Sequence, residues 1–218
     1  MNQSDVVTIR TLIHELNAKT YDYMLSHVDK YVRDLYNGNM SRDEFIDSMA
    51  SLIEAQLRRA WNEGMRNNDL DPQKDMTDEW EQEYQNLVLD QFNYIESYAD
   101  DILEGKENGA GVDQFRSRAQ LWANRYNETV SISEVVTAGK GDKLQWALGA
   151  TEEHCDTCLR LNGIVAYASE WEDLGVYPQN APNELLECGG WRCDCSLIPT
   201  DRRRSPDAYG TIIDIVSK

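Results

Sequence analysis

Five cysteines lie in the last third of the chain, and the rest of the sequence has none. They form two groups, Cys155-Asp-Thr-Cys158 and Cys188-Gly-Gly-Trp-Arg-Cys193-Asp-Cys195. Paired thiols at short spacing, brought together across a long intervening segment, suit the tetrahedral coordination of zinc. The residues therefore predict a structural zinc site made by Cys155, Cys158 and Cys188, with either Cys193 or Cys195 as the fourth ligand.

A further donor, His154, stands directly before Cys155. Neighbouring residues of an extended segment point to opposite sides, so His154 and Cys155 are not expected to bind the same ion. In the second group, Gly189 and Gly190 follow Cys188. Two glycines allow the chain to turn closely around an ion.

Two other uses of the cysteines are alternatives to a metal. A disulfide framework is disfavoured because the number of cysteines is odd and Met1-Asn-Gln-Ser-Asp5 lacks the basic and apolar regions of a signal peptide. A redox C-x-x-C normally lies between a strand and a helix of a βαβ unit, and the sequence has no repeated βαβ pattern.

The sequence does not predict an enzyme. A zinc deaminase needs an H-x-E element before its P-C-x-x-C motif, and neither is present. The three histidines, His14, His27 and His154, form no H-E-x-x-H motif, and there is no phosphate-binding G-x-x-x-x-G-K-[ST] loop or G-x-S-x-G motif. A zinc-dependent hydrolase or nuclease is the less favoured alternative.

The chain of 218 residues has 21 Lys and Arg against 39 Asp and Glu, which gives a net charge of −18. Such a charge repels nucleic acid over most of a surface, so weak or no nucleic-acid binding is expected. The exception to the acidic character is Arg202-Arg203-Arg204. No apolar run approaches the roughly 20 residues that span a bilayer, so no membrane association is expected.

The first two-thirds of the sequence predicts helices. The clearest begins at Ser41-Arg-Asp-Glu44, which matches a capping box and is followed by apolar residues at helical spacing. Further helices are predicted from Thr77 to Ile102 and from Phe115 to a stop at Gly139, with a loop at 105–111 and one or two helices within 4–36.

The pattern changes after Gly141. Short strands are predicted at 144–148, 163–167 and 195–198, and the prolines of 176–182 predict a surface loop. The expected fold is therefore α+β, with mainly helical N-terminal two-thirds and a small β-rich zinc-binding module. The expected divisions are a helical domain at 1–140, the cysteine-rich module at 141–200 and a C-terminal tail at 201–218.

The C-terminal sequence resembles a known family. The run from Leu144-Gln-Trp to Cys155-Asp-Thr-Cys158-Leu-Arg-Leu-Asn-Gly163, the prolines 178 and 182, and the final Cys193-Asp-Cys195 are similar to phage minor head proteins, the head morphogenesis group that includes the phage Mu protein F-like family. Many members have a histidine three residues before the C-x-C, where this chain has Gly190. Cys188 lies two residues upstream and is the expected replacement ligand.

The resemblance covers about residues 113–200 and implies a structural role. Members of the family are virion components of the portal region or the capsid interior that act in head assembly, and they are made in the host cytoplasm. It implies a portal protein or the major capsid protein as partner, with a homo-oligomer as a further option. The alternative function is a zinc-knuckle regulator that binds proteins outside the virion.

Overall fold

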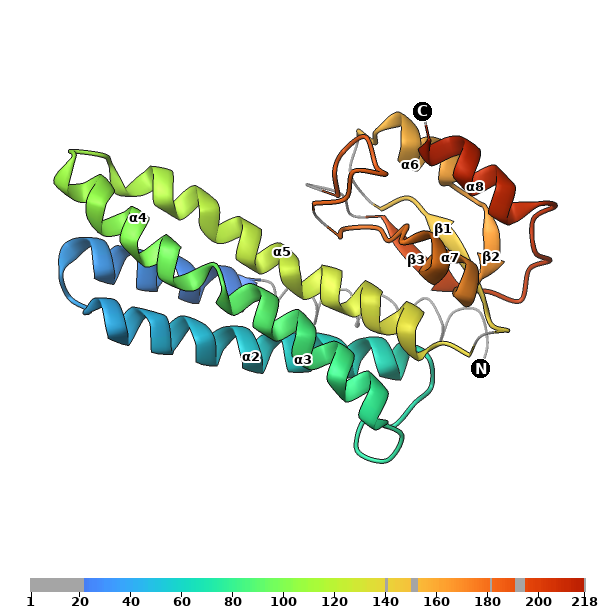
Figure 1. Cartoon of the computed structure of the whole chain (residues 1–218), viewed down its shortest axis with the longest axis horizontal. Helices are drawn as coiled ribbons and strands as arrows, with labels where there is room; N and C mark the ends of the chain where they lie inside the picture. Colours follow the sequence, from blue (N-terminus) through green and yellow to red (C-terminus); the bar gives the residue numbers. More distant parts are fainter. Residues whose placement is uncertain (1–21, 140, 150–152, 181, 191–194, 218) are drawn as a thin grey trace, which may run out of the picture. The chain divides into compact units, whose positions relative to one another are not determined.

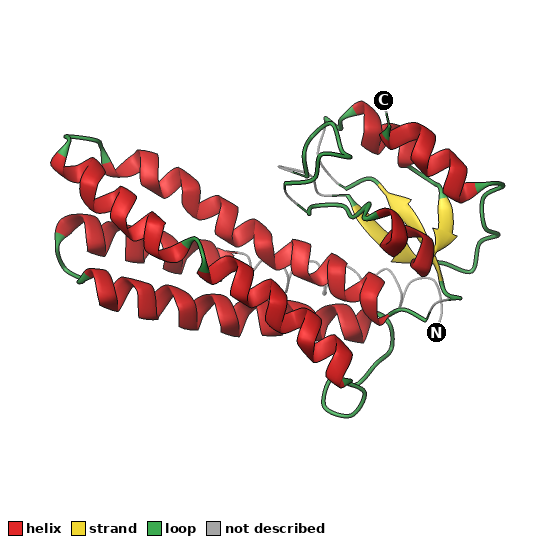
Figure 2. Cartoon of the chain, viewed as in Figure 1, coloured by secondary structure: helices red, strands yellow, loops and turns green. Residues whose placement is uncertain are grey.

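The computed structural model describes residues 22–139, 141–149, 153–180, 182–190 and 195–217. The described chain is mostly helical, with a small antiparallel sheet near its C-terminal end (Figures 1 and 2). This confirms the predicted order of helices followed by a small β-containing region. Residues 22–37 are helical. The labelled elements that follow are α2 (Arg42–Asn67), α3 (Asp78–Phe92), α4 (Ile95–Glu107), α5 (Val112–Thr137), β1 (Lys143–Ala147), α6 (Asp156–Leu161), β2 (Val165–Tyr167), α7 (Ala168–Leu174), β3 (Ser196–Pro199) and α8 (Ala208–Val216).

The chain packs as two compact units. The first consists of Met1–Arg58 and Gln85–Tyr126, and the second of Arg59–Tyr84 and Asn127–Lys218. The second unit therefore contains the C-terminal end of α2, the start of α3 and the end of α5 together with the sheet. The divisions at residues 140 and 200 that the sequence suggested stay predictions.

Helix α2 follows the sequence pattern closely. The Ser41 backbone N–H donates to Glu44 Oε2 at 2.8 Å, and the Glu44 N–H donates to Ser41 Oγ at 3.3 Å, so the predicted capping box is present. The pKa of the Glu44 carboxyl is lowered because the carboxyl accepts hydrogen bonds from the Ser41 backbone N–H and from the Ser41 hydroxyl. The apolar residues of the predicted stripe are all buried, namely Phe45, Met49, Leu52, Ile53, Ala60, Trp61 and Met65.

The helix expected from Thr77 to Ile102 is interrupted. It ends at Phe92, and α4 begins at Ile95, with Tyr94 as its N-cap. No proline or glycine marks this break, and Asn93 is only a weak helix former, so the break could not be predicted from residue types. The buried residues Ile95, Tyr98 and Ile102 then continue the apolar face on α4.

Helix α4 also runs further than expected, because Gly105 lies inside it and not in a loop. A Cβ at Gly105 would collide with the ring of Phe115, so the glycine is there for close packing against α5. Tyr98 strengthens the same contact, since its hydroxyl donates to the Phe115 carbonyl at 2.7 Å. Glycine here marks a helix–helix approach and not a helix end.

Another close approach of two helices occurs in the second unit, at Gly64 of α2. A Cβ at this position would lie 2.6 Å from the Ser133 Cβ and 2.6 Å from the Val130 carbonyl oxygen of α5. The Ser133 hydroxyl donates to the Trp61 carbonyl at 2.7 Å across the same contact. Backbone atoms form part of this contact, so it cannot yield by a side-chain rotation alone.

We expect Gly64→Ala to lower the free energy of unfolding by about 1–3 kcal/mol, because the added methyl overpacks the contact between α2 and α5. Urea denaturation of the full chain measures the change. Gly111→Ala is the matched control, since a Cβ there meets no atom within 4 Å. Equal free energies of unfolding for the two variants would show that α2 and α5 can move apart without loss of stability.

The sheet of the second unit has the order β2-β1-β3, with both pairs antiparallel. All three strands lie at the positions that the sequence predicted. Leu144 and Trp146 of β1 and Leu197 of β3 are fully buried, and they pack with Trp171 of α7 in one apolar cluster. The rings of Trp146 and Trp171 lie 5.8 Å apart between centroids. The sheet is therefore the support of a small core.

Residues 201–218 were expected to form a tail, but the structure shows a helix within them. In α8, Ala208, Ile212 and Ile215 are buried and belong to the same cluster as Trp146. Val135 near the end of α5 also belongs to it. The small module thus draws part of its core from segments on both sides of the cysteine-rich region.

Among the helices that the structure describes, none combines the length and the apolar character that crossing a bilayer requires.

Candidate metal centre

Three of the predicted ligands lie together. The sulfur atoms of Cys155, Cys158 and Cys188 are all within 4.8 Å of one another. Zn–S bonds of about 2.3 Å place two tetrahedral ligands about 3.8 Å apart, so no pair has to close by more than about 1 Å to bind one ion. The group could therefore hold a metal ion with small side-chain movements.

The first two sulfurs are positioned by the start of α6. Cys155 is the N-cap residue, with extended backbone angles of φ −69° and ψ 157°, and its sulfur accepts the Cys158 backbone N–H at 3.5 Å. This hydrogen bond fixes the Cys155 sulfur at the start of the helix, next to Cys158. Cys158 is on the first turn and is 1% exposed.

Two hydrogen bonds join the C-x-x-C segment to the segment that carries Cys188. The Asp156 backbone N–H donates to Glu187 Oε2 at 2.9 Å, and the Glu187 backbone N–H donates to Thr157 Oγ1 at 3.2 Å. These bonds hold the two segments together through groups that are not ligands. Neither Glu187 nor Thr157 was predicted to belong to the site. Their position next to Cys188 and Cys158 is the feature of the sequence that indicates it.

The chain turns sharply after Cys188, as the two glycines predicted. Gly189 and Gly190 have φ angles of 63° and 77°, in the left-handed region that favours glycine. The Gly189 N–H donates to the Leu186 carbonyl at 2.7 Å, and its own carbonyl accepts the Asn183 N–H at 2.9 Å. The turn is thus fixed by backbone bonds, which hold Cys188 beside α6.

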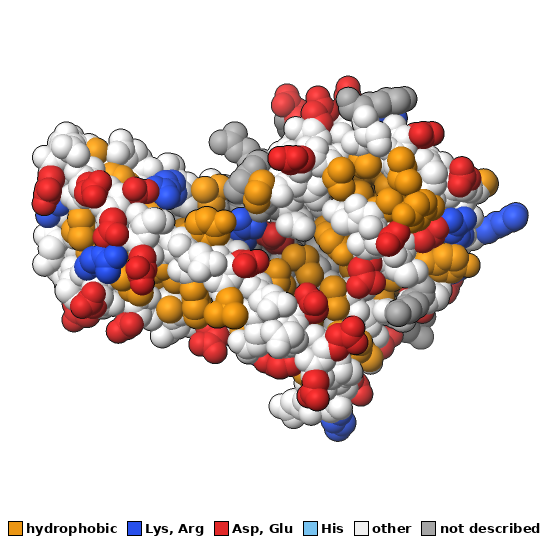
Figure 3. Space-filling view, in the orientation of Figure 1, with side chains coloured by type: hydrophobic (Ala, Val, Ile, Leu, Met, Phe, Trp, Pro, Cys, Tyr) orange, Lys and Arg blue, Asp and Glu red, His pale blue; other side chains and the backbone are white. Residues whose placement is uncertain are grey.

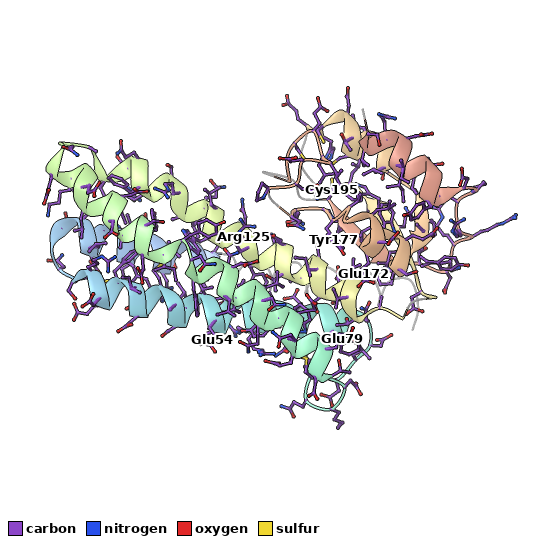
Figure 4. All side chains as sticks on the ribbon, in the orientation of Figure 1. Glu54, Glu79, Arg125, Glu172, Tyr177 and Cys195 are labelled. Atoms are coloured by element: carbon purple, nitrogen blue, oxygen red, sulfur yellow. The ribbon has the colours of Figure 1, made fainter. Side chains whose placement is uncertain are left out.

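Cys195 is placed differently from the three clustered cysteines. It directly precedes β3, where Figure 4 labels it. Its side chain is fully buried and belongs to the apolar core. Its sulfur lies 3.8 Å from Nδ1 of His154 and is outside the group of three sulfurs. Cys193 lies outside the described residues, so the choice between Cys193 and Cys195 as fourth ligand stays a prediction.

The cluster lies at the edge of the small core. Cys158 is part of that core, while Cys155 and Cys188 are partly buried and pack against it. The four described cysteines form no disulfide with one another. Sulfur ligands at the edge of an apolar core suit a soft metal ion.

Comparison with known proteins found no match: no family model, no curated protein and no solved structure is similar to this chain.

Proposed function

We propose that the three clustered cysteines bind one structural zinc ion, together with a fourth protein ligand. The observation that carries this is the shared position of Cys155, Cys158 and Cys188, supported by hydrogen bonds from groups that are not ligands. Thiolates select zinc over hard ions such as magnesium or calcium. Four protein ligands leave no open position for a water or a substrate, so the site stabilises the module and performs no catalysis.

We further propose that the protein is a phage minor head protein that acts in head morphogenesis through contacts with a portal or capsid protein. The residues that carry the family resemblance support this, because Trp146, Cys155, Cys158 and Cys188 pack in or against one core. A resemblance spread over unconnected segments would carry less weight. The proposal places the protein in the virion, at the portal or inside the capsid.

The charge of the protein also favours protein partners. Acidic side chains are spread over the face seen in Figure 3, and basic ones are few. With a net charge of −18, contact with another protein is more favourable than wrapping DNA.

We expect the wild-type protein to copurify with phage heads and to bring down a portal or capsid protein when it is captured from assembling cells. Cys158→Ser should lose both associations, because the module no longer folds without its metal. Arg66→Gln, an exposed change on α2, serves as the folded control. Capture of a non-virion protein, with none in purified heads, would favour the zinc-knuckle regulator.

A further inference from the structure

A hollow on the second unit gathers positive charge in an otherwise acidic protein. It has a volume of about 560 Å³ and is lined by Lys143, Tyr167, Arg203, Arg204 and Ser205, together with smaller groups. These residues come from the start of β1, the end of β2 and the loop that leads to α8. None of them belongs to the cysteine cluster.

The loop that forms one wall of the hollow is fixed by hydrogen bonds. Lys143 Nζ donates to the carbonyls of Asp201 and Arg202 at 3.1 and 2.7 Å. The Ser205 backbone N–H donates to the Val165 carbonyl at 2.8 Å, and the Val165 N–H donates to Ser205 Oγ at 3.0 Å. The hollow is thus formed by a loop that is attached to both β1 and β2.

Most of the positive charge here has no carboxylate to balance it. Arg204 forms an ion pair with Glu170, which raises the pKa of the Arg204 guanidinium and lowers that of the Glu170 carboxyl. In the described part of the chain, Lys143, Arg202 and Arg203 pair with no carboxylate. The carboxylate of Asp142, which adjoins Lys143 in sequence, accepts the Gly139 N–H instead.

We propose that this hollow is a binding site for the phosphate group of a small phosphorylated molecule. The Arg203 guanidinium, the remaining N–H of Lys143 and the Ser205 hydroxyl are the donors for its oxygens. The Ser205 oxygen already accepts the Val165 N–H, so its own hydrogen is available to donate.

A phosphate fits this charge better than a carboxylate does. Two cations that line the hollow without a carboxylate partner, Lys143 and Arg203, suit a group that carries close to two negative charges. Several donors suit its three terminal oxygens. The Tyr167 ring, with the Arg204 guanidinium 5.6 Å from its centroid, provides a flat wall for the rest of the molecule. Duplex DNA is disfavoured because its other phosphates would meet an acidic surface.

Titration calorimetry of the full chain tests the site, with inorganic phosphate and adenosine monophosphate as separate ligands. We expect saturable binding of both ligands at low salt, weakened about tenfold by Arg203→Gln, which removes one charge-assisted contact. Arg203 is exposed and forms no hydrogen bond or ion pair with another described residue, so the variant should fold normally. Binding of adenosine monophosphate alone would assign the affinity to its base and overturn the proposal.

Arg66→Gln removes an exposed arginine on α2, outside the hollow, and should leave the phosphate affinity unchanged. If both variants weaken binding equally, the effect is one of net charge and the site does not exist. A short DNA duplex is the third ligand. Duplex binding that is tighter than phosphate binding and is lost in Arg203→Gln would show a polynucleotide site instead, and no heat with any ligand also overturns the proposal.

Discussion

Removal of the metal is expected to unfold the cysteine-rich module while the first unit stays helical. Metal binding contributes on the order of 10–16 kcal/mol to the folding of small zinc modules, which exceeds what a small core can replace. The first unit has its own core, which includes Met24, Phe45, Ile53, Tyr98 and Trp122. The helices of that unit should therefore persist when the sulfur ligands are released.

Cys158→Ser is the sharpest variant for this result, because Cys158 is both a proposed ligand and a buried residue of the core. We expect loss of the single bound zinc in elemental analysis, loss of the near-ultraviolet signal of Trp146 and Trp171, and retention of most helical circular dichroism. Treatment of the wild type with a strong chelator should give the same change. A metal-free wild type that keeps its full near-ultraviolet signal would contradict the proposal.

Cys195→Ala is the matched control for the ligand variants. Because the Cys195 sulfur lies outside the group of three, we expect this variant to keep its zinc while losing about 1–2 kcal/mol of stability from the smaller core side chain. Cys193→Ser should then lose the metal. The opposite pattern, with zinc lost only in Cys195→Ala, would assign Cys195 as the fourth ligand.

Much of the fold could be predicted where one physical rule acts locally. The capping box at Ser41 and Glu44 and the helical spacing from Phe45 to Met65 both describe a single helix, and both are present. The three strands were found for the same reason, since short β-branched and apolar runs lie between turns. The spacing of the cysteines predicted that Cys155, Cys158 and Cys188 lie together, because cysteine is uncommon and its thiol is a specific metal ligand.

Other features depend on contacts that the sequence does not display. Gly105 predicts the start of a loop, but its lack of a side chain instead allows Phe115 to pack closely against α4. The helix within 201–218 was not predicted, although Ile212 and Ile215 follow helical spacing, and both are buried in α8. The bonds of Glu187 to the C-x-x-C segment join residues that are far apart in the chain, so periodicity could not reveal them.

A buried carboxyl in the second unit leads to the last prediction, which concerns pH. Burial raises the pKa of Glu134 to about 7, the Asn67 side chain that donates to it opposes the rise, and the charge of Glu63 adds to it. The neutral form is thus favoured in the folded state, whereas the ordinary pKa of 4.5 applies after unfolding. Its contribution to stability is fully present below pH 4.5 and is lost as pH rises through 7.

Glu134→Gln should remove this pH dependence, because the amide is neutral at every pH and keeps an oxygen to accept from Asn67. A pKa shift of this size corresponds to roughly 3 kcal/mol. The variant should therefore be more stable than the wild type by up to that amount at pH 8, and its stability should be close to that of the wild type at pH 5. Urea denaturation between pH 5 and pH 8 gives the difference in stability between the two proteins at each pH, in which the contributions of the groups that they share cancel.

Asp90→Asn on α3 removes an exposed carboxylate and is the control for the loss of one negative charge. The Asn68 side chain donates hydrogen bonds to the Glu134 carbonyl at 2.7 Å and to Thr137 Oγ1 at 3.0 Å, and neither bond involves the Glu134 carboxyl. They hold the end of α2 against α5 whether or not the carboxyl is charged. The charge of the carboxyl is therefore the quantity that changes with pH. If the free energies of unfolding of Glu134→Gln and the wild type differ by a constant amount from pH 5 to pH 8, the carboxylate reaches water in the folded protein.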